Sequence, residues 1–293
     1  MYNNYKKSGI IHKIVGQNIR NKLYDGISSL EIVESIENDI KKYTKYNSSK
    51  PWDSGIGFPV GISINDVAAH FTPCKNENPI ISNDDIVKID YGVHINGCIT
   101  DGAFSWCPSG KYNKLIKIAE KATMIGIKNS GPDAVLGDIG NDIQEYIESQ
   151  EIVIDNKLFS PKSTYDLSGH KISQYIIHAG KAVPNIYVPF YKERMKENEI
   201  FAVETFPTIG DGSLITEKDC NHFMITEYSD DFDELTKKIY NERKTLAFCP
   251  RWFDFKIPDN EYIKKYPVLR SNGIVAQFEK TIFIKDNGVE IMN

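Results

Sequence analysis

The chain has 293 residues, of which 41% are hydrophobic and 26% are charged, and this length allows one large α/β domain with a sizeable core. No apolar run approaches the roughly 20 residues that a membrane-spanning helix requires, so we expect no membrane contact. The formal net charge of −5 argues against direct nucleic-acid binding as the main activity. The 5 cysteines form no C-x-x-C pair, which argues against a disulfide framework and a thiolate zinc site. The start of the sequence has no apolar segment typical of a secretory signal, and we therefore expect a cytoplasmic protein.

Two helices are predicted at the beginning of the chain. The first covers residues 10–23. In the second, Ser28 and Glu31 form a capping box, and apolar residues near helical spacing continue the helix to about Tyr46. The Ser, Pro, Asp and Gly content of residues 47–57 marks a loop. A strand-rich region follows this loop, and the main body of the domain begins there.

The middle of the chain is predicted to form a β-hairpin followed by two helices. Residues 86–95 and 98–106 are β-rich runs separated by Asn96-Gly97, which is the strongest short hairpin signal. Residues 111–130 and 133–149 have the pattern of two helices, with a Gly-Pro break between them.

Two further strands are predicted in the last third of the chain. They cover residues 200–206 and 275–284, and the second of them is expected to close the chain. Between them lies a polar stretch with a helical segment at 230–244 and a portion rich in Pro, Asp and Asn. We therefore predict that residues 221–266 are an insertion into a single domain that covers residues 1–293.

The hairpin brings two aspartates together. If Asn96-Gly97 is a two-residue turn, the register places Asp101 opposite Gly92, with Asp90 as its diagonal neighbour on the same face. Two such carboxylates can share a cation, whereas without a cation at least one of them needs a raised pKa or access to solvent. For an arbitrary pair of aspartates a solvent-exposed face is the commoner arrangement. The apolar residues beside Asp90 favour a half-buried site, and Gly92 is expected to leave open space next to it.

Two histidines and two glutamates also need partners. The even spacing of His170 and His178 would place both on one face of an extended segment, although a lone histidine is more often a structural residue than a metal ligand. Glu204 and Glu279 each lie in an apolar, strand-like stretch, where an unpaired carboxylate is costly. From the residues alone, a metal site and a set of hydrogen-bonded structural groups both stay open.

Several strings in the sequence resemble those of type 2 methionine aminopeptidases. The likeness runs from about Phe58 to Ile284 with largely preserved spacing, which makes it more specific than any single motif. The strings are Phe58-Pro59-Val60-Gly61, Ala68-Ala69-His70-Phe71-Thr72-Pro73, Lys88-Ile89-Asp90-Tyr91-Gly92, Ser168-Gly169-His170, Ile177-His178-Ala179-Gly180-Lys181 and Gln277-Phe278-Glu279.

The resemblance implies the pita-bread fold of these metallopeptidases. This α/β (α+β) catalytic domain has a pseudo-twofold, curved antiparallel sheet covered by helices, and type 2 members carry a helical insertion. The resemblance also implies two divalent metal ions, from among Mn, Co, Fe and Zn. Asp90 would chelate one ion, and Asp101 and Glu279 would bridge both. His170 and Glu204 would complete the other site, and this carboxylate-rich set favours harder ions such as Mn or Fe.

The resemblance further implies the reaction and its substrate contacts. The chain would remove the initiator methionine from nascent polypeptides with a small second residue, acting as a monomer, with the ribosome as a candidate partner. His70 would hydrogen-bond the scissile amide, and His178 would contact the substrate near its carbonyl. Besides these two histidines, the residues that bind the substrate would be Phe58, Ile177, His222, Ala247 and Tyr266.

Two alternatives belong to the same fold. A proline-specific pita-bread peptidase would share the five ligands, but the surroundings of His178 and the residues Phe58 and His222 resemble those of methionine-specific members. A catalytically inactive pita-bread protein would act as a binding protein. Such relatives typically lose ligands, whereas this chain has the expected residue type at all five positions.

Overall fold

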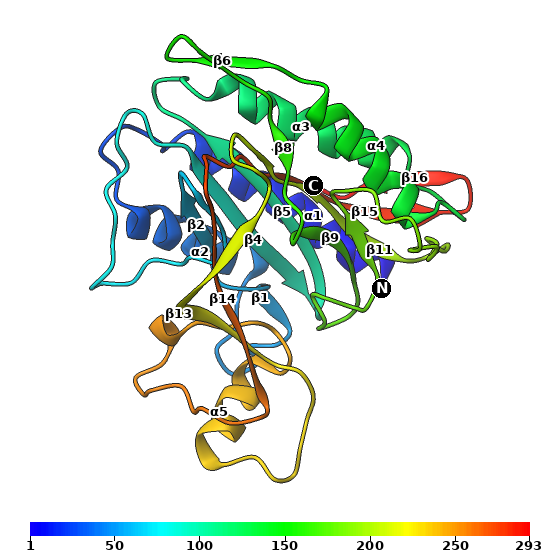
Figure 1. Ribbon diagram of the computed structural model, residues 1–293. Coiled ribbons are helices and arrows are strands. Elements are labelled where there is room, and N and C mark those ends of the chain that lie inside the picture. The colour runs from blue at the N-terminus through cyan, green and yellow to red at the C-terminus, as the bar shows by residue number, and fades with distance from the viewer.

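The computed structural model describes residues 1–293 and contains two larger antiparallel sheets that meet at their edges (Figure 1). The first sheet is 4-stranded, and in it β4 (Val87–Ile95) pairs with β1 (Ser54–Ile56), β2 (Gly61–Ile64) and β5 (Cys98–Trp106). The second sheet is 5-stranded and has the order β10-β9-β11-β15-β16. Its strands are β9 (Ser168–Ile172), β10 (Ala182–Pro184), β11 (Ile200–Thr205), β15 (Phe278–Lys285) and β16 (Gly288–Ile291). The two sheets adjoin where β5 lies beside β15.

Three smaller sheets complete the β structure. One contains β13 (Leu214–Ile225), β14 (Ile263–Ser271) and β3 (Val67–Ala69) in that order. The others are the pairs β8 (Lys162–Ser163) with β12 (Pro207–Thr208), and β6 (Ile152–Ile154) with β7 (Lys157–Phe159). Because β16 follows β15, the prediction that residues 275–284 close the chain is wrong. The strand β16 follows it and pairs antiparallel with β15, so the two strands form a final hairpin.

The hairpin of β4 and β5 has the predicted register. Ile95 pairs with Cys98, and Gly92 pairs with Asp101. Asn96 and Gly97 both adopt positive φ, 49° and 72°, as a two-residue turn that matches the twist of the strands requires. The local turn chemistry therefore sets the pairing of both strands.

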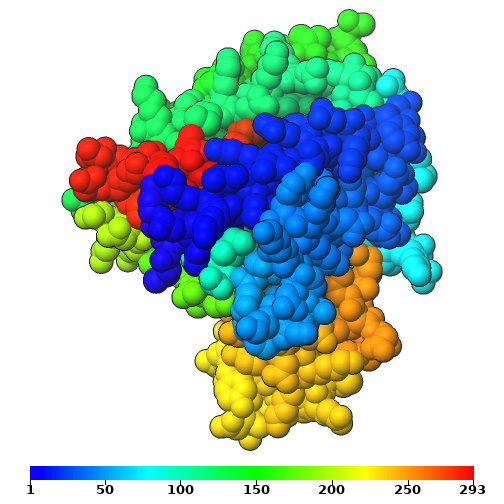
Figure 2. Space-filling view, turned by 180° about the vertical axis from the view of Figure 1, so that it is seen from behind, coloured from blue at the N-terminus to red at the C-terminus, as the bar shows by residue number.

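Two helices at the N-terminus cover one face of the first sheet. They are α1 (Tyr2–Arg20) and α2 (Ser29–Thr44), and Figure 2 shows them in blue across the back of the molecule. The Ser28 side chain accepts a hydrogen bond from the Glu31 backbone N–H at 3.1 Å, as the predicted cap requires. The first helix starts earlier than predicted because its first turns pack against the end of the chain, where Gly9 lies against the backbone of Met292.

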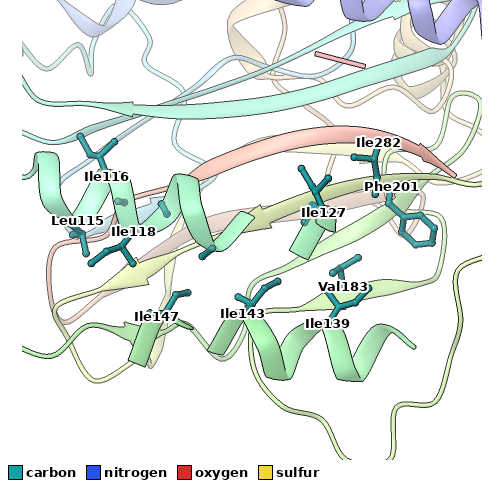
Figure 3. Packing of buried hydrophobic residues seen from close by; sticks show 14 of the residues in the cluster. Leu115, Ile116, Ile118, Ile127, Ile139, Ile143, Ile147, Val183, Phe201 and Ile282 are labelled. Carbon is teal, nitrogen blue, oxygen red and sulfur yellow. The ribbon is translucent and has the colours of Figure 1, made fainter. Parts of the chain in front are cut away.

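Two more helices cover the second sheet. In α3 (Asn113–Lys128) and α4 (Leu136–Glu148), isoleucines recur at helical spacing and point into a common core (Figure 3). There they meet Phe201 of β11 and Ile282 of β15. Burying each such side chain contributes about 1.5–3 kcal/mol, so this packing holds the second sheet against its helices.

The segment between β13 and β14 projects from the body (Figure 1). It contains α5 (Glu234–Arg243) and a short 3₁₀ helix, η1 (Pro250–Trp252), around a small apolar core of its own. Arg251 forms an ion pair with the buried Glu37 of α2, which attaches this segment to the body. The predicted insertion, 221–266, begins and ends inside the two strands, and this division of the chain stays a prediction. None of the helices combines the length and the apolar character that a membrane-spanning segment needs.

Candidate metal centre

The five predicted metal ligands come together where the two sheets meet. Asp90 and Asp101 project from β4 and β5 on one side. On the other side, Glu204 of β11 lies directly opposite Glu279 of β15 in the register, and His170 of β9 pairs with Ala202, two positions from Glu204 on the same face. His170 Nε2 lies 3.5 Å from Asp101 Oδ2 and 3.8 Å from Glu204 Oε1. Residues from five different strands therefore form one cluster.

Four residues of the cluster are buried, Asp90 is half-buried, and the cluster is rich in unpaired polar atoms. Asp101 and Glu279 are 4% and 2% exposed. The atoms without a hydrogen-bond partner include one oxygen each of Asp90 and Asp101, both carboxylate oxygens of Glu279, and Nδ1 of His170. Buried polar groups in proteins are normally paired, so these atoms require an explanation.

Burial and mutual repulsion raise the pKa of three of the carboxylates. For Asp90 and Glu204, loss of hydration raises the pKa first and the charge of Asp101 raises it further. For Glu279, burial acts first, followed by Asp101 and then Glu204. Without a cation, the protein must therefore keep protons on these groups or lose stability.

Divalent cations fit this set of donor atoms. Asp101, His170 and Glu279 can each place one ligand atom within 4.8 Å of the others, close enough to surround one ion. Carboxylate oxygens with one imidazole are ligands for ions such as Mn, Fe, Co and Zn. A bound cation would use the unpaired oxygens and remove the repulsion between the carboxylates.

The cluster lines a cavity of about 440 Å³. All five ligand candidates border this cavity, namely Asp90, Asp101, His170, Glu204 and Glu279. The predicted substrate-binding residues line the same cavity, and they are Phe58, His70, Ile177, His178, His222, Ala247 and Tyr266. The structure thus brings every predicted site residue to one cavity, although it does not assign their roles.

His70 is held in an uncommon backbone conformation. Its φ of 69° lies in the left-handed region, which residues other than glycine rarely adopt. Its Nδ1 lies 3.1 Å from the backbone oxygen of Pro267, and this carbonyl can only accept a hydrogen bond. Burial lowers the pKa of His70. The ring is therefore neutral near pH 7, with the proton on Nδ1 and a free lone pair on Nε2.

His178 reaches the centre by a route different from the predicted one. The segment after His170 is not extended, because β9 ends at Ile172 and a bridge between Ser173 and Ile176 turns the chain back. The turn places the His178 ring 4.4 Å from the His170 ring. The prediction of one extended face is wrong, and a tight turn brings the two rings together instead.

The surroundings of His178 keep its ring neutral. His178 is an exposed residue that lines the cavity, and loss of hydration there, followed by the neighbouring His170 and His70, lowers the pKa of its ring. Its Nδ1 lies 3.3 Å from the Tyr266 hydroxyl. If this hydroxyl donates to Nδ1, the proton of the neutral ring is on Nε2.

Gly92 does not leave the open space that we predicted beside the aspartates. The Phe58 ring lies where a side chain at position 92 would be, and a Cβ atom there would overlap the ring. Gly92 therefore admits an aromatic ring next to Asp90 and Asp101. The absence of a side chain serves packing, and it shapes the apolar wall of the cavity.

Gln277 is a member of the site that the sequence analysis did not single out. Its Nε2 donates hydrogen bonds to Asp90 Oδ2 at 3.1 Å and to Glu204 Oε2 at 3.3 Å. It thereby links a carboxylate of the first sheet to one of the second. Gln277 and Glu279 are two residues apart in the predicted strand 275–284, so their side chains are expected on the same face. This spacing could have identified Gln277 as a site residue.

The family model for the metallopeptidase family M24 matches residues 3–286 of this chain. The protein named methionine aminopeptidase 2 from Clavispora lusitaniae is 34% identical over an alignment of 313 residues with gaps. The alignment covers 100% of this chain and 71% of that protein. Its namesake from Dictyostelium discoideum is 35% identical over 311 residues, with coverages of 100% and 70%.

Solved structures of several proteins share the fold. A methionine aminopeptidase from Thermotoga maritima has a TM-score of 0.69 at 19% identity and covers 98% of this chain and 94% of its own. A thermophilic Arx1 has a TM-score of 0.79 at 13% identity, with coverages of 99% and 90%. A prolidase from Pyrococcus furiosus has a TM-score of 0.62 at 13% identity, with coverages of 99% and 63%. The predicted pita-bread fold is confirmed, and since proteins with different names share it, the fold alone does not choose between their activities.

Proposed function

Since this chain belongs to the metallopeptidase family M24, we propose that it removes the N-terminal methionine from nascent polypeptides and peptides, preferring a small second residue. The observation that carries this proposal is the cluster of three buried carboxylates, the half-buried Asp90 and one imidazole beside a cavity with apolar lining residues. Two relatives that are 34% and 35% identical to this chain over its whole length are named methionine aminopeptidase 2, which supports the same activity.

The five clustered side chains would hold two divalent ions. In this assignment Asp90 would bind one ion, Asp101 and Glu279 would be shared by both, and His170 and Glu204 would complete the other site. When bound, such ions polarise the scissile carbonyl and supply hydroxide near neutral pH for attack on the peptide bond. The unpaired oxygens of Asp90, Asp101 and Glu279 support this assignment, and the carboxylate-rich set favours Mn or Fe.

His70 would bind the amide of the bond that breaks. Its Nδ1–H donates to the Pro267 carbonyl, so its Nε2 is an acceptor for the N–H of the second residue of the substrate. The lowered pKa keeps this acceptor unprotonated at neutral pH. The left-handed backbone at His70 would orient the ring toward the cavity that it lines.

His178 would stabilise the charge that develops on the carbonyl oxygen. We assign the hydrogen bond between Tyr266 and His178 as donated by the tyrosine hydroxyl, which leaves Nε2–H of the histidine as a donor. Such a donor, held in place before the reaction, acts on negative charge in the transition state more than on the neutral carbonyl. Tyr266 would thus contribute through the orientation and tautomer of His178.

The methionine side chain would enter the apolar part of the cavity. Phe58 lies over Gly92 beside the two aspartates, and Ile177 and Ala247 are 7% exposed members of one apolar cluster with it. His222 is held by the Pro59 carbonyl, 3.2 Å from its Nε2. An apolar pocket of this kind favours an unbranched thioether side chain and excludes charged residues from the first position.

The two alternatives are less well supported. An inactive binding protein would have no need for carboxylate oxygens that are buried without partners, whereas a metalloenzyme would use them. A proline-specific peptidase would share the ligands but not the apolar pocket around Phe58 and His222. We place the protein in the cytoplasm, because nascent N-termini emerge there, and we treat the ribosome as a candidate partner. We also propose that it acts as a monomer.

The proposal predicts metal-dependent release of methionine. The purified chain is incubated with Met-Ala-Ser, Met-Leu-Ser or Ala-Pro-Ser and Mn²⁺ or Co²⁺, and free amino acids are quantified with and without a chelator. We expect methionine to be released from Met-Ala-Ser and not, or far more slowly, from Met-Leu-Ser. No methionine should be released after chelation of the metal. Release of alanine from Ala-Pro-Ser in place of methionine would support the proline-specific alternative, and no release from any peptide would contradict the proposal.

Replacing His70 by Ala tests its role in the reaction. We expect a loss of about 100-fold or more in kcat/KM with unchanged metal content, because the lost group contacts substrate and not metal. The matched control is His94→Ala, which removes another buried histidine, one that accepts a hydrogen bond from the Gly97 backbone outside the cavity. Equal activities of the His70 variant and the control, both with full metal content, would show that His70 has no catalytic role.

A further inference from the structure

The candidate metal centre spans a junction at which the usual connection between strands is missing. β5 carries Asp101, and its neighbour β15 carries Glu279, but no backbone ladder pairs these two strands. Within a sheet, ladder hydrogen bonds hold neighbouring strands about 4.8 Å apart. Other groups must therefore set the distance between these two strands.

Two buried hydroxyl groups connect β5 to β15 and to Gln277, the residue directly before β15. Thr281 Oγ1 accepts from the backbone N–H of Asp101 and donates to the backbone carbonyl of the same residue, both at 2.8 Å. Ser105 Oγ accepts from the N–H of Gln277 at 2.8 Å and donates to its carbonyl at 2.9 Å. Each hydroxyl thus satisfies both backbone groups of one residue on the opposite strand. We refer to these two contacts as the hydroxyl bridges.

The hydroxyl bridges have a symmetric arrangement. Each strand supplies one hydroxyl and one backbone partner, and the two partners on each strand are separated by the same number of residues. Gln277, which directly precedes β15, and Thr281 within β15 flank Glu279 at equal distances along the chain. The bridges therefore lie on both sides of the point where the two ligand-bearing strands face each other.

Other contacts leave the hydroxyl bridges as the main connection. The side chain of Asn293 adds one further link, donating to the Asp101 carbonyl at 2.7 Å and accepting from the Thr281 N–H at 2.9 Å. On the side of α1, a cavity of about 230 Å³ borders the junction and is lined by Ala103, Glu279 and Asn293 among others. Apolar packing is therefore incomplete there.

We propose that Thr281 and Ser105 are positioning residues for the metal centre, whose hydroxyls set the separation of β5 and β15 and with it that of Asp101 and Glu279. The proposal rests on the proposed function, since it takes these two carboxylates as metal ligands. Both carboxylates are buried and repel each other, so the strands would move apart if nothing held them. A metal site tolerates ligand displacements of only about 0.5 Å.

Thr281→Val removes one hydroxyl bridge with little change in side-chain shape, and Thr281→Ser retains it. The affinity of each full-length variant for Mn²⁺ is measured by calorimetry, and methionine release is measured in parallel. We expect Thr281→Val to bind Mn²⁺ about 10- to 100-fold more weakly, the usual effect of removing a group that orients a metal ligand. Thr281→Ser should stay within about threefold of the unsubstituted protein because its hydroxyl can form the same two hydrogen bonds.

Thr100→Val is the matched control. Thr100 precedes Asp101 on β5, is fully buried and forms a hydrogen bond with Ser8 Oγ of α1 at 2.7 Å, away from β15. Its loss should lower the free energy of unfolding as Thr281→Val does, without changing the affinity for Mn²⁺. Should Thr281→Val fail to fold, Ser105→Ala and Ser105→Thr provide the same comparison at the other bridge.

The results separate this inference from the proposed function. Weak Mn²⁺ binding by Thr281→Val, with normal binding by Thr281→Ser and Thr100→Val, supports the inference. Unchanged binding by Thr281→Val, or equal weakening in Thr100→Val, overturns it while the proposed function stands. If the unsubstituted protein binds no Mn²⁺ and releases no methionine, the proposed function fails, and the inference fails with it.

Discussion

Replacing Glu279 by Gln tests whether the clustered carboxylates make the protein unstable without a cation. Both carboxylate oxygens of Glu279 are buried without hydrogen-bond partners. Burial, and after it Asp101 and Glu204, raises its pKa. The folded metal-free protein therefore holds a proton on this group at pH values where the unfolded chain has released it. The contribution of this group to stability is thus fully present below about pH 4.3, the pKa of a glutamate in the unfolded chain. It is lost as the pH rises through the higher pKa that Glu279 has in the folded protein.

The expected loss follows from the number of protons involved. Each group that binds a proton only in the folded state lowers the free energy of unfolding by about 1.4 kcal/mol per pH unit within that interval. Glu279→Gln removes one such group and supplies an amide donor beside Asp101. We expect the metal-free variant at pH 8 to be more stable than the metal-free unsubstituted protein by about 1–3 kcal/mol, the usual cost of an unsatisfied buried polar group.

Bound metal should reverse this order. A ligand at one hundred times its Kd stabilises the folded state by about 2.7 kcal/mol, and the variant lacks one of the ligands that would bind it. Urea unfolding is followed by circular dichroism at pH 5 and pH 8, with a chelator or with Mn²⁺. If the metal-free variant is less stable than the metal-free unsubstituted protein at pH 8, Glu279 is favourably placed without a cation, and our account of the site is wrong.

Two further substitutions test the surroundings of the site. Gly92→Ala places a methyl group where the Phe58 ring lies, so we expect a higher KM for Met-Ala-Ser with unchanged Mn²⁺ affinity, and an unchanged KM would contradict the role of Phe58 in the pocket. Glu37→Ala leaves the Arg251 guanidinium and the Trp252 N–H without their buried acceptor, which should lower the free energy of unfolding by about 3–5 kcal/mol. Urea unfolding measures this loss, and a change below about 1 kcal/mol would show that the ion pair does not attach the projecting segment to the body.

The sequence predicted the hairpin and its aspartate pair for a local reason. Asn96 and Gly97 adopt the positive φ values that a two-residue turn needs, and strand alternation then fixes which side chains share a face. Asp90 and Asp101 are thereby neighbours before any other part of the chain is considered. Helix caps such as Ser28 are equally local, and the structure confirms that cap.

Contacts between distant segments were beyond such local reasoning. The turn at Ser173 and Ile176, which brings His178 to His170, has no strong turn signal in the sequence. The start of α1 depends on packing against the last residues of the chain. The donor role of Gln277 toward Asp90 and Glu204 likewise depends on how the two sheets meet.

The amino-acid sequence was enough to identify the side chains with ligand chemistry, the local pairing of Asp90 with Asp101 and, through the resemblance, the family. The long-range packing was needed to place Glu204 opposite Glu279 and to bring both glutamates to the aspartate pair. The reason is physical: turn conformation and strand alternation act between neighbours in the chain. The distance between two sheets depends instead on helix packing and on the hydroxyl bridges, which join residues far apart in the sequence.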